Sequence, residues 1–172
     1  MNKKQVFLTI YSIAIKLLSL VPTVLLLFLI FGFSAQDGDT SGSLSFEISL
    51  FLVKLFAPFL PAAMSEDILL ERAELIHYFV RKAAHMTEYF LLALSLQLPL
   101  AAWLSRIFSV KTRILAGFVC TVLFAALDEF HQTFVPGRSG NVTDVCIDSI
   151  GAMAASLILF LCYSIYQKKL AR

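Results

Sequence analysis

The run DEFHQTFVPGRSGNVTD at residues 128–144 decides how this chain folds, because it separates two long apolar segments with a dense set of charges. Each segment, about residues 112–131 and 142–166, is long enough to cross a bilayer, which takes about 20 apolar residues. Ionisable groups at the edge of a membrane span are costly and indicate a functional site. A second polar run, RKAAHMTEY at residues 81–89, opens another apolar segment. The two runs together predict one site.

The composition is that of a membrane protein. Of the 172 residues, 59% are hydrophobic and 15% are charged, whereas a soluble domain typically has about 45–50% and about 25%. The formal net charge is only +2 and the basic residues are scattered, which argues against nucleic-acid binding. The three cysteines lie in apolar segments without disulfide or metal spacing. We therefore expect a single membrane domain over residues 1–172.

Four segments have the length and hydropathy of a membrane-spanning helix, at about residues 6–33, 83–104, 112–131 and 142–166. The first is longer than the apolar core of a signal peptide, which is about 7–15 residues, so we expect it to be retained as a span. The outer segment, residues 34–82, separates the first two spans. The expected fold class is all-α membrane, with four transmembrane helices plus interfacial or amphipathic helices in the outer segment.

The outer segment is expected to contain three parts. Residues 34–43 have the composition of a polar loop. Residues 44–60 are apolar but short, and Pro58 and Pro61 close them, which fits an interfacial or re-entrant helix better than a span. A serine followed by two acidic residues at 65–67 is typical of a helix start. It predicts an amphipathic helix that lies along the membrane surface and leads into the second span.

The distribution of basic residues predicts the orientation, because cytoplasmic loops carry an excess of lysine and arginine. One side of the predicted topology carries the termini and the short loop near residue 106, whereas the other side carries the acidic outer segment. We therefore expect a multi-pass protein of the bacterial plasma membrane, with both termini cytoplasmic and the polar site at the outer face. The basic residues on the predicted cytoplasmic side are Lys3, Lys4, Arg106, Lys111, Arg113, Lys168, Lys169 and Arg172.

Helical spacing brings the polar side chains of both runs toward one outward-facing cavity. Lys82, His85 and Tyr89 share one face of the second span. Asp144 and Asp148 lie one turn apart on the fourth span, above small residues that permit close helix contact. The candidate ligand-binding residues are Arg81, Lys82, His85, Glu88, Tyr89, Asp128, Glu129, Gln132, Arg138, Asp144 and Asp148. Two of them, His85 and Asp128, are also candidate catalytic residues.

The charge balance of the site is negative. Three cations face five carboxylates, which leaves −2 while His85 and His131 are neutral. Such a site should protonate its histidines or carboxylates, or attract an amine or a metal cation. Standard hydrolase, phosphate-loop and zinc signatures are absent. We predict no cofactor and assign no metal ligand, while a divalent metal stays open because carboxylates and histidines can ligate one.

Individual members of the cluster also have structural interpretations. Asp144 is placed to cap a helix, because acidic residues suit a helix N-terminus. Arg81 and Lys82 could anchor the second span at the interface, and His85 could be a hydrogen-bonded core residue. His131 and Glu129 could face water or headgroups. The clustering is a stronger argument than any one residue, because burying this many ionisable groups as structure alone is expensive.

The two polar runs resemble those of the VanZ-like family of bacterial membrane proteins. The resemblance extends from the loop at residues 33–36 to the fourth span, and Met86, where many members carry an aromatic residue, is a conservative departure. It implies a small multi-span helical protein. The founding member is linked to reduced susceptibility to teicoplanin, a lipid-bearing glycopeptide, without remodelling the peptidoglycan precursor. The matching polar residues are family motif residues without agreed catalytic roles.

Three functions stay open at this point. The first is a non-enzymatic factor in the cell envelope that engages a membrane lipid, a lipid-linked wall precursor or a lipoglycopeptide. The second is an enzyme that acts on a lipid-linked or peptidoglycan-like substrate, with His85 or Asp128 as general base. The third, a transporter or channel subunit, is disfavoured because the charges gather at one face instead of crossing the bilayer.

Overall fold

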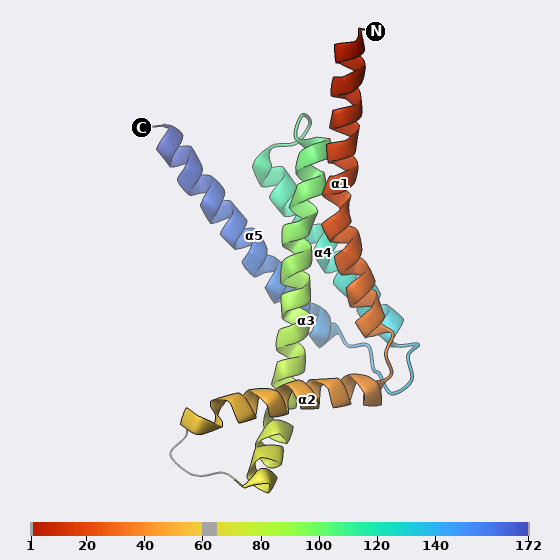
Figure 1. Ribbon diagram of the computed structural model, residues 1–172, viewed down its shortest axis with the longest axis vertical. Helices are drawn as coiled ribbons and strands as arrows, with labels where there is room; N and C mark the ends of the chain where they lie inside the picture. Colours follow the sequence, from red (N-terminus) through yellow and green to blue (C-terminus); the bar gives the residue numbers. More distant parts are fainter. Residues whose placement is uncertain (1, 60–64, 172) are drawn as a thin grey trace.

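The computed structural model describes residues 2–59 and 65–171, which fold entirely into helices and short connections (Figure 1). Five helices are long and apolar enough to cross a membrane, which confirms an all-α membrane fold. A short 3₁₀ helix, Ala57–Phe59, extends the second of them. The long helices are α1 Lys3–Ser34, α2 Gly38–Phe56, α3 Glu66–Leu104, α4 Val110–Gln132 and α5 Val142–Leu170.

Helix α3 is the centre of the fold, because it packs against each of the other four long helices. One core cluster joins Tyr89 and Leu92 of α3 to Ile30 of α1 and Ala125 of α4. In a second cluster, small residues let α3 and α5 approach closely, as is usual between membrane helices. That cluster consists of Ala93, Ala152 and Ala155.

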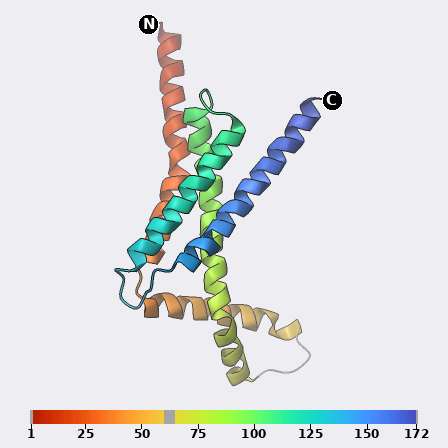
Figure 2. The same ribbon diagram turned by 180° about the vertical axis from the view of Figure 1, so that it is seen from behind.

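Helix α2 has a different direction from the other helices. Figures 1 and 2 both show it running across α3, near the end of the molecule that carries the loop between α4 and α5. The two termini and the loop between α3 and α4 lie at the opposite end. Helix α2 therefore meets the length and hydropathy of a span but does not run alongside the bundle, so the predicted count of four spans stays a prediction.

The predicted polar loop at residues 34–43 is mostly wrong, because α2 already begins at Gly38. The side chain of Asp37 caps this helix by accepting a hydrogen bond from the Thr40 amide at 2.7 Å. Further along, Ser43 Oγ donates to the carbonyl oxygen of Thr40. Serine, threonine and aspartate are frequent in loops, but the same side chains can satisfy backbone groups at a helix start. The predicted end of this segment, Leu60 and Pro61, lies outside the described residues.

The predicted surface helix and the predicted second span, which meet at residue 83, form one helix. Helix α3 is continuous from Glu66 to Leu104, with Ser65 at its N-cap as predicted but without a capping side-chain hydrogen bond. Residues 66–98 contain neither glycine nor proline, and charged residues do not break a helix. The cations of the second polar run therefore lie within one long helix.

The start of α5 carries a testable local feature. Asn141 is its N-cap, and its side chain accepts a hydrogen bond from the Thr143 amide at 2.9 Å. Replacing Asn141 by alanine should lower the free energy of unfolding by about 1 kcal/mol, the usual cost of losing a cap. Unfolding by SDS titration in mixed micelles measures this change. The serine variant keeps an acceptor oxygen and should match the wild type, so equal losses in both variants would contradict the capping role.

Candidate functional site

Arg138 connects the loop after α4 to the end of α1. Its Nη2 donates to the carbonyl oxygen of Phe33 at 2.8 Å, and its Nε donates to that of Gln36 at 3.0 Å. Its third contact is from Nη1 to Gln132 Oε1 at 3.2 Å. The carbonyls at a helix C-terminus lack partners within the helix and carry a partial negative charge. The guanidinium therefore caps α1 from a distant part of the chain.

The charge of Arg138 is maintained although its side chain is partly buried. Burial lowers the pKa of its guanidinium, and the nearby Arg81 lowers it further, whereas Asp128 and Glu129 act in the opposite direction. An arginine begins so far above neutrality that it stays cationic in a protein. The loop thus places a permanent positive charge beside the carboxylates of α4.

Gln132 separates that positive charge from Asp128. Its Oε1 accepts from Arg138, and its Nε2 donates to Asp128 Oδ2 at 3.1 Å. Both residues on α4 are buried, one turn apart. The amide therefore fixes the carboxylate in place without neutralising it.

The Glu129 carboxylate ties α4 to α5. Its Oε2 accepts a hydrogen bond from the Asn141 amide at 2.9 Å, where α5 begins. The side chain is buried, so a position in water or headgroups is wrong for this residue. This contact gives Glu129 a structural role, because it joins the two ends of the loop between α4 and α5. A role in ligand binding would come in addition.

Two charge pairs connect or line α3. Lys82 makes an ion pair with Asp144, which joins α3 to α5. Within α3, His85 Nδ1 lies 3.4 Å from Glu88 Oε2, yet both atoms are buried and neither makes a hydrogen bond to a described residue. Lys82 and Asp144 therefore satisfy each other, whereas His85 and Glu88 keep hydrogen-bonding capacity.

Asp148 and Tyr89 are the most deeply buried polar members of the cluster. The exposed fractions of their side chains are 2% and 0%, and Asp148 Oδ2 and the Tyr89 hydroxyl have no hydrogen-bond partner among the described residues. Asp148 is close enough to interact electrostatically with His85 and Asp128. Unsatisfied buried polar groups cost about 1–3 kcal/mol each, so these atoms call for a functional explanation.

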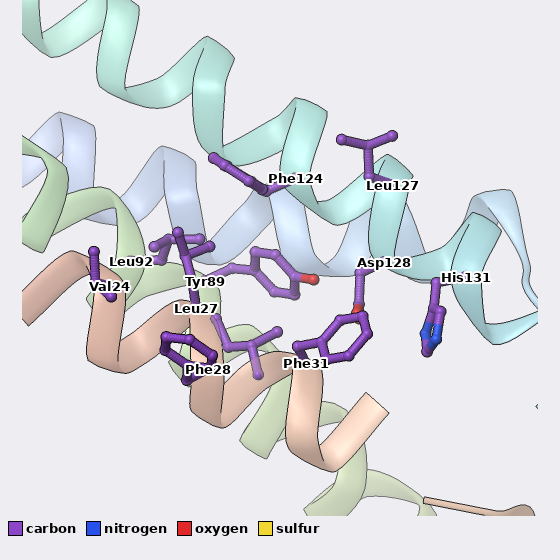
Figure 3. Close-up of a pocket in the computed structure, with 11 residues that line it drawn as sticks. Val24, Leu27, Phe28, Phe31, Tyr89, Leu92, Phe124, Leu127, Asp128 and His131 are labelled. Carbon is purple, nitrogen blue, oxygen red and sulfur yellow. The ribbon is translucent and has the colours of Figure 1, made fainter. Parts of the chain in front are cut away.

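An apolar groove of about 470 Å³ lies between α1, α3 and α4. Its wall is made of aliphatic and aromatic side chains, and Tyr89, Asp128 and His131 contribute its polar groups (Figure 3). The Tyr89 hydroxyl points toward Asp128. We call this cavity the apolar groove; its wall consists of Val24, Leu27, Phe28, Ile30, Phe31, Leu92, Phe124 and Leu127.

A second, smaller cavity of about 170 Å³ lies where α2 crosses α3. Four predicted site residues line it, together with side chains of α2 and the end of α1. We call it the polar pocket; its charged or titratable members are Arg81, His85, Glu88 and Arg138. The structure thus distributes the predicted cluster over two cavities, while Lys82, Glu129, Gln132, Asp144 and Asp148 line neither.

Several contributors to the site were missed by reasoning from the sequence. The Phe33 and Gln36 carbonyls are backbone groups that any residue would supply, so the sequence carries no signal for them. Ser34 Oγ lies 3.5 Å from His131 Nδ1, and the Phe31 ring lies over that imidazole, with centroids 4.7 Å apart. His131 therefore packs against α1 beside the apolar groove.

Residues 2–59 and 65–171 contain no group of three or more histidine, cysteine, aspartate or glutamate side chains arranged to hold a metal ion. Three of the carboxylates each have their own partner instead. Asp128 accepts a hydrogen bond from Gln132, Glu129 accepts one from the Asn141 amide, and Asp144 forms an ion pair with Lys82. The structure therefore does not test whether the protein binds a divalent metal.

Comparison with known proteins gives one result for most of the chain. The family model described as VanZ/LLP1 matches residues 19–163, which include α2 to α4 and both polar runs. No curated protein and no solved structure matches the chain significantly.

Proposed function

Because this chain belongs to the VanZ/LLP1 family of membrane proteins, we propose that its polar cluster engages a membrane lipid, a lipid-linked wall precursor or a lipoglycopeptide. Through this binding the protein acts in the cell envelope and contributes to tolerance of teicoplanin. The observation that carries the proposal is the apolar groove, whose polar groups include the buried carboxylate of Asp128. A hydrocarbon chain fits such a wall, and a polar headgroup fits the carboxylate and hydroxyl beside it.

The orientation of the site is part of the proposal. The basic residues at the termini and in the loop between α3 and α4 belong on the cytoplasmic side. The loop that carries Arg138 and the crossing helix α2 then lie at the outer face. Helix α2 buries Ser45 and Ser49 and exposes Phe51, Leu55 and Phe56. A helix with large apolar side chains on its free face suits the membrane interface, so four spans cross the bilayer and α2 lies along its surface.

Drug susceptibility tests this function. We expect a host that lacks its own family member to gain tolerance to teicoplanin, but not to vancomycin, when it expresses this chain. The Asp128→Asn variant should lose that protection, because it replaces the charged oxygen beside the groove with an amide. Asp67→Asn is the matched control, since Asp67 is exposed at the far end of α3. At equal membrane levels, protection that survives in Asp128→Asn would refute the role of the cluster.

A catalytic function is the second candidate, and the buried atoms at and near His85 that make no hydrogen bond to the described residues favour it. His85 Nδ1, Glu88 Oε2 and Asp148 Oδ2 are buried without hydrogen bonds among the described residues. A buried histidine beside carboxylates suits acid–base chemistry on a lipid-linked or peptidoglycan-like substrate. Lipid and wall-precursor profiles of cells that express wild type, His85→Gln or Asp128→Asn test this function. Identical profiles for all three would remove the enzyme candidate.

A further inference from the structure

Three carboxylates of the cluster are buried without a cation. Asp128, Glu129 and Asp148 are at most 8% exposed, and none of them makes a salt bridge within 4.0 Å among the described residues. Of the three cations of the cluster, Lys82 pairs with Asp144, Arg138 donates to two carbonyls and to Gln132, and Arg81 lines the polar pocket instead of the apolar groove. A buried carboxylate without a cation is costly in a membrane. A positively charged group bound in this region would therefore stabilise the carboxylates.

Asp128 is the carboxylate that can receive a cation from outside, because it lines the apolar groove. Glu129 accepts a hydrogen bond from the Asn141 amide, and Asp148 does not line the groove. Beside Asp128, the Tyr89 hydroxyl also lines the groove, fully buried and without a hydrogen bond to the described residues. A carboxylate and a hydroxyl are two acceptors that face the same space, as Figure 3 shows.

The groove is accessible from the side of the bundle. Phe28 on α1 and Leu127 on α4 contribute to its wall and are 72% and 62% exposed. Both belong to helices that are long and apolar enough to cross the membrane, so their exposed surfaces face hydrocarbon. Asp128 lies one turn from the end of α4, near the depth at which headgroups meet the hydrocarbon core. A lipid can therefore enter sideways, with its chain along the wall and its headgroup at Asp128.

We propose that the apolar groove binds one hydrocarbon chain of a membrane phospholipid whose primary amine pairs with Asp128 and donates to the Tyr89 hydroxyl. The inference rests on the proposed function, which it deepens by naming the headgroup chemistry. An ammonium group carries three hydrogen-bond donors and a full positive charge. Its donors match the Asp128 carboxylate and the Tyr89 hydroxyl, and its charge offsets the unpaired carboxylate. Recognition of the phosphate instead would need a lysine or arginine side chain at the groove, and none lines it among the described residues.

Lipid binding to the purified full chain in one detergent, followed by native mass spectrometry, tests the proposal. The probes are phosphatidylethanolamine, its N-acetyl derivative and phosphatidylglycerol, all with the same acyl chains. N-acetylation removes the positive charge of the amine and leaves the chains unchanged. We expect phosphatidylethanolamine to bind the wild type about tenfold more tightly than the other two, as loss of one charge-assisted hydrogen bond implies.

Variants assign that preference to the groove. Asp128→Asn should reduce the affinity for phosphatidylethanolamine to that for the N-acetyl derivative, while the exposed Asp67→Asn keeps the preference. Val24→Trp fills the groove and should weaken binding of all three lipids. If a variant fails to fold, the comparison of the three lipids on the wild type still decides. Equal affinities there would overturn the proposal, and so would binding of dodecylamine from solution without binding of phosphatidylethanolamine.

The outcomes also separate this inference from the proposed function. Teicoplanin protection that is lost in Asp128→Asn, combined with equal affinities for the three lipids, would overturn the amine proposal and leave the proposed function standing. A strong preference for the amine without any teicoplanin protection would support the inference and remove drug tolerance from the function.

Discussion

Replacing Gly151 by alanine is expected to destabilise the protein by about 3 kcal/mol, the upper end of the usual cost of overpacking. A Cβ atom at this position would collide with the carbonyl oxygen of Met86 on α3. That oxygen belongs to the helix backbone, so it cannot rotate away as the end of a side chain could. Helix α5 would have to move away from α3, and Asp148, one turn away on α5, would move with it.

Gly32 provides the matched control, because it lies inside α1 with nothing within 4 Å of an added Cβ. Alanine is the better helix former by about 1 kcal/mol, so Gly32→Ala should be neutral or stabilising. The same glycine-to-alanine change is thus expected to lower the free energy of unfolding at Gly151 and to leave it unchanged or raise it at Gly32. SDS titration of both variants in mixed micelles measures the effect. A stabilised or unchanged Gly151→Ala protein would show that α3 and α5 do not pack as described.

The close contact behind this prediction could be predicted from the sequence. Gly151, Ala152 and Ala155 follow Asp148 at helical spacing, and small residues at such positions indicate a helix interface. The structure confirms it, since all three are buried and the two alanines pack with Ala93 of α3. The hydropathy of the long apolar segments likewise predicts helices at α1, α4 and α5, whose observed ends differ from the prediction by only a few residues.

The outer segment could not be predicted as well, because its local composition is ambiguous. Glycine, serine and aspartate near residue 40 suit a loop as well as a capped helix start, and the capping contact of Asp37 with Thr40 decides between them. The direction of α2 depends on what it packs against. Its first residue also contacts the distant loop, where the Gly38 amide donates to the carbonyl oxygen of Pro136 at 3.1 Å. No periodicity within α2 encodes that contact.

For the site, the sequence identified the residue types but not their partners. Pairing Lys82 with Asp144 needs the distance between α3 and α5, and helical spacing within one segment cannot supply it. Arg138 is a candidate ligand-binding residue by sequence, whereas two of its three contacts are to backbone carbonyls at the end of α1 and just after it. His131 packs against Phe31 of α1. Both contacts exist because the end of α1 lies beside the loop that follows α4. The apolar groove depends on three helices, and only the structure brings them together.

Replacing Arg138 by lysine is expected to lower the free energy of unfolding by about 2 kcal/mol, as loss of charged hydrogen bonds implies, although the positive charge is kept. The guanidinium reaches three acceptors in different directions, namely the carbonyls of Phe33 and Gln36 and the amide of Gln132. A lysine ammonium is a single point on a flexible stem and cannot match a planar fork. The carbonyls at the end of α1 then lose their cap, and Gln132 loses the contact that orients it toward Asp128.

Hydrogen–deuterium exchange can locate this effect, because local opening raises exchange where the lost bonds were. Residues 33–40 and 133–140 of Arg138→Lys should exchange faster, while the middle of α3 should not change. Arg106→Lys, an exposed change of the same type at the opposite end of the bundle, should leave both regions as in the wild type. Because lysine preserves the charge, a wild-type exchange pattern in Arg138→Lys would mean that charge alone suffices. Faster exchange confined to these two segments would instead show that the arginine fork holds α1, the loop and the Asp128 side chain in one arrangement.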